Sequence, residues 1–134
     1  YSRALSTVYW PGDGMSGELV GCHSAALARY GTTNLRKLLK AGVPIVATRG
    51  KSHPYPCGSR LLLRNPSTRY YSIGIKMDTG PYHCYSPLGD KKVMFLCKKP
   101  SFRRSHIDIT PKIAKELGHI GYQYLDIWLL EGPI

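Results

Sequence analysis

Carboxylates are scarce in this sequence. Only 8 of its 134 residues are Asp or Glu, against 19 Lys and Arg, so the formal net charge is +11. A chain this basic is expected to associate with polyanions, namely nucleic acid, anionic lipid or an acidic cell-wall polymer. A basic surface without such a partner is the simpler alternative. Any acid–base chemistry by a side-chain carboxyl must use one of Asp13, Glu18, Asp78, Asp90, Asp108, Glu116, Asp126 and Glu131.

Long apolar runs are also absent. Runs such as Leu61-Leu62-Leu63 are short and flanked by charge, far below the roughly 18 apolar residues that a membrane span needs. The hydrophobic fraction of 43% still allows one packed core, so a single globular domain is expected rather than disorder. No repeat is visible, which excludes collagen, coiled-coil and tandem-repeat folds. The chain starts at Tyr1 without an apolar leader, as a processed or trimmed form would, and this leaves secretion open.

No pair of cysteines has the two-residue spacing that is typical of zinc sites. The four cysteines are Cys22, Cys57, Cys84 and Cys97. In a small chain rich in loops they favour one or two disulfides and an oxidising compartment, with the pairing left open. Zinc binding by these cysteines and nearby histidines, or free buried thiols, are the alternatives. We predict no metal and no organic cofactor.

β-Strand patterns dominate the chain. The segment 69–77 alternates, with Tyr71, Ile73 and Ile75 on one face, and it leads directly to Asp78. Thr33 or Asn34 can cap a short helix, and Thr110 with Pro111 begins another. Strands with two short helices between them indicate a small mixed β-barrel, with a sandwich as the alternative. Strands are predicted at 4–10, 43–48, 59–65, 69–77, 107–109 and 122–130, with a further short strand at 93–97. Helices are predicted at 33–41 and 112–117. An irregular basic insertion is predicted at 82–104.

Several short motifs follow one another in a recognisable order. They are Val8-Tyr9-Trp10-Pro11-Gly12, Ser16-Gly17-Glu18, Tyr55-Pro56-Cys57-Gly58-Ser59, Met77-Asp78-Thr79-Gly80-Pro81 and Ile107-Asp108-Ile109-Thr110, followed by Leu117-Gly118. In this order they resemble the double-psi β-barrel family of rare-lipoprotein-A-type lytic transglycosylases, expansins and barwin-like proteins. The resemblance implies one six-stranded double-psi β-barrel over residues 1–134. Its two insertions would lie at about 19–52 and 82–105.

The same resemblance implies a reaction. A lytic transglycosylase of this type cleaves the glycan strand of peptidoglycan with a carboxyl group that acts as acid and then as base, without a metal. Asp78 is the expected acid/base and Glu18 the second carboxyl, although a turn-capping Asp and a solvated Glu are the simpler readings. Asp108 also matches a family position, but the helix start after it favours a structural role. The expected substrate-binding residues are His53, Tyr9, Tyr55, Gly80 and Tyr82.

Non-catalytic functions remain open beside this one. An expansin-like module would bind wall polysaccharide with the same basic surface and no cleavage. A structural component of a phage tail or secreted assembly would engage the wall and use the insertions to dock a partner. Nucleic-acid binding rests on charge alone, because no known nucleic-acid motif is present. The predicted partner is peptidoglycan or another anionic wall glycan, and the predicted location is extracytoplasmic: periplasmic, secreted or virion-associated.

Overall fold

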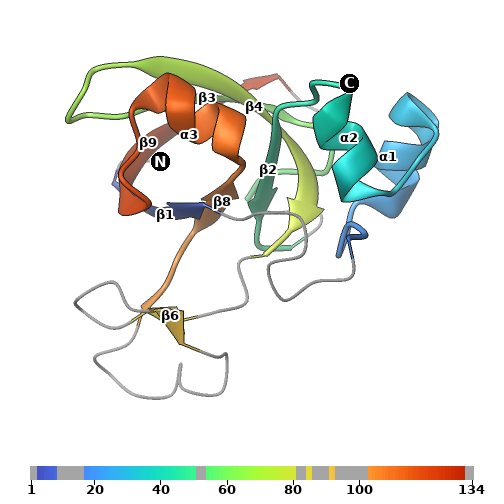
Figure 1. The fold of residues 1–134 in the computed structure, drawn as a ribbon, viewed down its shortest axis with the longest axis horizontal. Coiled ribbons are helices and arrows are strands. Elements are labelled where there is room, and N and C mark those ends of the chain that lie inside the picture. The colour runs from blue at the N-terminus through green and yellow to red at the C-terminus, as the bar shows by residue number, and fades with distance from the viewer. Residues whose placement is uncertain are drawn as a thin grey trace.

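Six strands close into a barrel in the order β1-β8-β2-β4-β3-β9 (Figure 1). The computed structural model describes residues 3–8, 17–50, 54–80, 84–85, 91–92 and 103–131; for 84–85, 91–92, 103–104 and 131 only the backbone is described. The barrel strands are β1 (Ala4–Val8), β2 (Ile45–Thr48), β3 (Arg60–Arg64), β4 (Tyr71–Thr79), β8 (Ile107–Ile109) and β9 (Tyr122–Glu131). The mainly-β barrel expected from the sequence is confirmed.

The barrel is mixed. β1 pairs with β8 and β2 pairs with β4 in parallel, whereas the other neighbouring strands are antiparallel. This arrangement is compatible with a double-psi barrel. Three two-residue strands, β5 (Cys84–Tyr85), β6 (Lys91–Lys92) and β7 (Arg103–Arg104), form a separate antiparallel sheet within the stretch expected to be an irregular insertion. The strand predicted at 93–97 lies outside the described residues.

Strand alternation fills the barrel interior. Leu61 and Leu63 of β3 point inward and are fully buried, as are Leu125 and Ile127 of β9, so their neighbours along each strand face outward. Helix α3 (Pro111–Leu117) adds Ile113 and Leu117 to the same core. Its predicted bounds are confirmed to within one residue.

One glycine lets the core close. A Cβ added at Gly74 would lie 2.5 Å from Val46 Cγ1 and 3.5 Å from Ile113 Cδ1. β4 therefore needs a residue without a side chain where β2 and α3 approach it.

Two helices cover the outside of β2. They are α1 (His23–Tyr30), which the sequence patterns missed, and α2 (Leu35–Lys40), which they predicted. Asn34 caps α2 as expected, because its side chain accepts a hydrogen bond from Lys37 N at 3.0 Å. Ile45 and Ala47 pack under these helices while Val46 points into the barrel. β2 is thus buried on both faces, which explains its continuous apolar run. Residues 45–48 belong to the barrel, so the insertion bounds of 19–52 are too wide.

A disulfide ties the helical segment to the loop before β3. Cys22 precedes α1, and it is bonded to Cys57 across 35 residues of sequence. Disulfides of this kind are typical of an oxidising compartment outside the cytoplasm. The side chains of Cys84 and Cys97 lie outside the described part of the chain. Within that part, no group of three or more His, Cys, Asp or Glu side chains is arranged to hold a metal ion.

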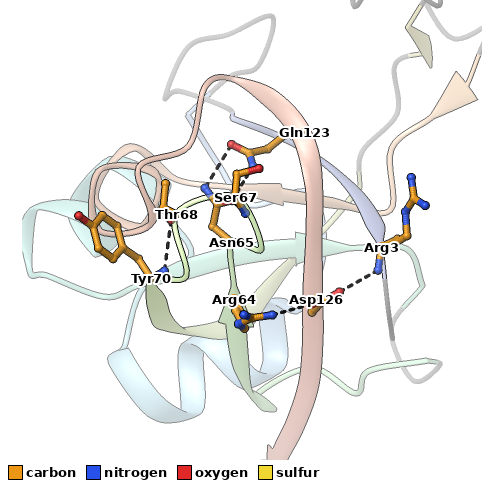
Figure 2. Close-up of polar contacts among 8 residues, drawn as sticks. All are labelled: Arg3, Arg64, Asn65, Ser67, Thr68, Tyr70, Gln123 and Asp126. Carbon is orange, nitrogen blue, oxygen red and sulfur yellow. Dashed lines mark hydrogen bonds and ion pairs between the residues drawn. The ribbon is translucent and has the colours of Figure 1, made fainter.

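A buried amide joins the turn after β3 to β9 and α3. Asn65 is fully buried, and its side chain donates to Leu117 O at 2.9 Å. Its side-chain oxygen accepts from Ser67 N at 3.0 Å and from Gln123 Nε2 at 2.8 Å (Figure 2). One side chain therefore fixes the turn, the end of the helix and the start of the last strand.

His119 is held in its neutral form. The backbone N–H of Gly121 donates to its Nδ1 at 2.9 Å, so the proton lies on Nε2, which donates to Ser6 Oγ at 2.8 Å. Ser6 Oγ in turn donates to Gln123 O at 2.7 Å. Burial lowers the pKa of His119 from 6.5 to about 4. Protonation would break the bond from Gly121 and charge a group that is mostly surrounded by protein.

We therefore expect His119 to make the protein less stable in acid. Because its pKa is lower in the folded than in the unfolded chain, the unfolded chain binds more protons between pH 6.5 and 4. The free energy of unfolding should fall across this window by on the order of 1–2 kcal/mol more than in His119→Gln, allowing for solvent screening. Urea unfolding of both proteins at several pH values measures the difference. Equal pH slopes for the two proteins would contradict the role of His119.

Candidate functional site

Asp78 lies near the end of β4 and is buried. Its side chain is 1% exposed. Its Oδ1 accepts hydrogen bonds from the backbone N–H groups of Val20 at 2.7 Å, Gly21 at 3.1 Å and Thr79 at 2.8 Å. Amide donors stabilise a carboxylate anion and fix its position. The arrangement matches the turn-capping role that the sequence left open, and not an acid at the floor of an open groove.

The segment that covers Asp78 fits closely. A Cβ added at Gly21 would lie 2.4 Å from both Cγ2 and Oγ1 of Thr79. Only glycine therefore allows the chain before α1 to approach β4 near enough for its amides to reach the carboxylate.

Lys76 is the buried cation of this region. Its Nζ donates to Thr48 O at 2.9 Å, to Gly50 O at 2.6 Å and to the Thr48 hydroxyl. Burial lowers the pKa of Lys76 from 10.5 to about 8, and attraction to Asp78 acts in the opposite direction. Lys76 and Asp78 are two residues apart on β4. Together they connect the ends of the two parallel strands with the loop before α1.

Glu18, the other expected catalytic carboxyl, points elsewhere. It is exposed, forms an isolated β-bridge with Asn34, and its Oε2 accepts a hydrogen bond from the Thr33 hydroxyl at 2.6 Å. The chain between Glu18 and Gly21 lies against Asp78, so the fold brings the two segments together. The Glu18 side chain instead binds Thr33, two residues before the start of α2.

The remaining predicted site residues are only partly described. Gly80 donates its N–H to Thr48 O at 3.2 Å, which continues the pairing of β4 with β2. Tyr55 packs against the barrel core and lines a cavity of about 50 Å³ together with Arg49 and His106. A cavity of this volume holds only a few water molecules and no sugar ring. Tyr9, His53 and Tyr82 lie outside the described residues.

A polar cluster lies near this cavity, and no sequence motif predicts it. The Thr7 hydroxyl donates to Asp108 and lies 3.0 Å from Ser105 Oγ, and Arg49 donates to Ser105 O at 3.1 Å. His106 Nδ1 accepts from Leu5 N, and burial together with the charge of Arg49 lowers the pKa of His106. The contacts join β1, β2 and β8, so Asp108 has the structural role that the sequence favoured for it.

The outer face of the barrel holds a second candidate site. Arg3 stacks on Tyr124 with its guanidinium carbon 4.9 Å from the ring centre, and Arg64 lies 5.9 Å from the centre of Tyr71. The Asp126 carboxylate lies between the two arginines (Figure 2), 3.6 Å from Arg64 Nη1 and 3.0 Å from the backbone N of Arg3. Sequence patterns predicted the strands but did not single out these side chains.

Comparison with known proteins returns no family model that matches the chain and no match among curated proteins. The class that the strand topology defines is a small closed six-stranded mixed β-barrel, compatible with a double-psi barrel. Among the described residues, no helix combines the length and the hydropathy needed to cross a lipid bilayer.

The two expected catalytic carboxyls should differ sharply in their effect on stability. Asp78→Asn removes a buried charge that faces three amides and attracts Lys76, so we expect the free energy of unfolding to fall by roughly 2–4 kcal/mol. Glu18→Gln changes an exposed side chain and serves as the matched control, with a change within about 0.5 kcal/mol. Urea denaturation of the three proteins makes the comparison. An Asp78→Asn protein as stable as the wild type would contradict a structural role for Asp78.

Proposed function

We propose that this barrel binds an anionic cell-wall glycan, such as peptidoglycan with its attached acidic polymers, without cleaving it. The observation that carries the proposal is the charge balance. The chain has 19 Lys and Arg against 8 Asp and Glu, a net charge of +11, so positive charge dominates the field that an approaching polymer meets. Each carboxylate with a described side chain is also held by contacts within the protein. The bound carboxylates are Glu18 on Thr33, Asp78 on three amides, Asp108 on Thr7, Glu116 on Ser72 and Asp126 beside Arg3 and Arg64.

The disulfide favours a wall polymer over nucleic acid. A protein that keeps Cys22–Cys57 oxidised is expected outside the cytoplasm, where the abundant polyanions are wall glycans and lipid headgroups. The barrel and the motif order resemble wall-acting families, which supports the same choice. A periplasmic, secreted or virion-associated location follows from this proposal.

Cleavage of the glycan by Asp78 is the competing function. A general acid must come within hydrogen-bonding distance of the oxygen that it protonates. At 1% exposure, and with three amides on one oxygen, Asp78 would have to lose the covering segment at Val20 and Gly21 before a glycan could reach it. This geometry supports binding over catalysis.

Purified peptidoglycan sacculi test both functions at once. We expect the protein to sediment with sacculi at about 0.1 M salt and to be released, with about a tenfold loss of binding, as salt approaches 1 M, where the Debye length shrinks from about 10 Å to about 3 Å. Mass spectrometry of the supernatant should find no anhydro-muropeptides.

Three results would overturn the proposal. The first is the absence of binding at about 0.1 M salt, and the second is tighter binding to double-stranded DNA than to sacculi. The third is the release of anhydro-muropeptides by the wild type and Glu18→Gln but not by Asp78→Asn, assayed well below its unfolding temperature. That outcome would instead assign the cleavage to Asp78.

A further inference from the structure

Four residues from neighbouring strands form one row on the outside of the barrel. Arg64 of β3 pairs with Tyr71 of β4 on one side and with Asp126 of β9 on the other. The backbone N of Arg3, next to β1, donates to the Asp126 carboxylate. The row faces outward because the residues that alternate with it, such as Leu63 and Leu125, are buried in the core. It spans three strand spacings, or about 14 Å.

Both arginines in the row are held in place. Arg3 rests on Tyr124 and Arg64 on Tyr71, while Asp126 lies between them. Stacking orients a guanidinium but leaves most of its N–H groups free to donate, and its planar fork matches a carboxylate or a phosphate. Tyr71 remains 54% exposed, so its ring can still receive a ligand.

An apolar row lies beside the charged one. Leu62 pairs with Ile73 on β4 and with Trp128 on β9, two residues along each strand from Arg64, Tyr71 and Asp126. Ile73 is 40% and Trp128 45% exposed. An exposed apolar strip next to fixed charges is typical of a binding surface. The C–H faces of sugar rings fit such aromatic side chains.

Hollows border the charged row at both ends. One of about 710 Å³ is lined by Arg3, Tyr124, Asp126 and the turn at Pro66 and Ser67. The other, of about 450 Å³, is lined by Tyr71, Ile73 and Lys112 among others. The row connects the two hollows, so a linear polymer can lie across the strands.

We infer that this outer face of β4, β3 and β9 binds the anionic glycan, with acidic groups on Arg3 and Arg64 and sugar rings on Tyr71 and Trp128. The inference rests on the proposed function and locates its site. Charge complementarity selects the occupant: four cations, Arg3, Arg60, Arg64 and Lys112, border the strip, against two described carboxylates, Asp126 beside Arg64 and Glu116 on Ser72. Because the cations outnumber these carboxylates, an anionic glycan fits this face better than a neutral one.

Paired variants separate this surface from the general charge of the protein. Arg3→Gln with Arg64→Gln should weaken sedimentation with sacculi at about 0.1 M salt by about tenfold or more, because two oriented donors are lost. Arg29→Gln with Arg36→Gln on α1 and α2 removes the same charge elsewhere and should cost less than about threefold. Tyr71→Ala with Trp128→Ala should match the first pair, and Tyr71→Phe should bind as the wild type does. Thermal unfolding checks that each variant is folded.

The outcomes separate the two proposals. If the wild type does not bind sacculi, the proposed function fails. If it binds and the arginine and aromatic pairs bind as well as the Arg29/Arg36 control, the function stands and this site is wrong. Sacculi stripped of phosphate-containing polymers test which acidic groups the protein binds. If the protein still binds the stripped sacculi, the ligand groups are carboxylates; if binding is lost, they are phosphates.

Discussion

A buried pair of opposite charges on β4 connects the parts of this fold. Lys76 donates to Thr48 and Gly50 at the end of β2, and Asp78 accepts from Val20 and Gly21 before α1. Each charge is surrounded by backbone groups of the opposite polarity, which stabilise it in the interior. The pair therefore joins β4 by hydrogen bonds both to the end of β2 and to the loop that leads into α1.

Local patterns were sufficient for the six barrel strands and for two of the three helices, but not for the two-residue strands β5, β6 and β7. Alternation in 69–77 and the capping signals at Asn34 and Pro111 are properties of neighbouring residues, so they can be read from the sequence. α1 has no comparable signal. Its N-cap residue, Cys22, provides no side-chain cap, and only Ala26 is buried among its residues. This helix depends on contacts with β2 and on the disulfide, which are distant in sequence.

The candidate sites, like α1, depend on contacts between residues that are distant in sequence. The sequence places Asp78 at the end of a strong strand, but the amides that cover it come from residues 57 and 58 positions earlier. Alternation also puts Tyr71 and Ile73 on one face without saying which face is outside. Large apolar residues lie on both faces of β9, so its pattern does not reveal that Trp128 is 45% exposed. Closure of the barrel decides which face of each strand is exposed, and no short sequence pattern predicts that closure.

The Cys22–Cys57 bond has a consequence for partial opening of the molecule. It closes a loop that contains α1, α2 and β2. If the two helices detach, the crosslink holds Cys22, just before α1, beside the loop before β3, and this raises the effective concentration for rebinding. The loss of chain entropy on rebinding is correspondingly small. Transient uncovering of β4 would thus be brief and reversible while the crosslink is intact, and a reducing environment would make it long-lived.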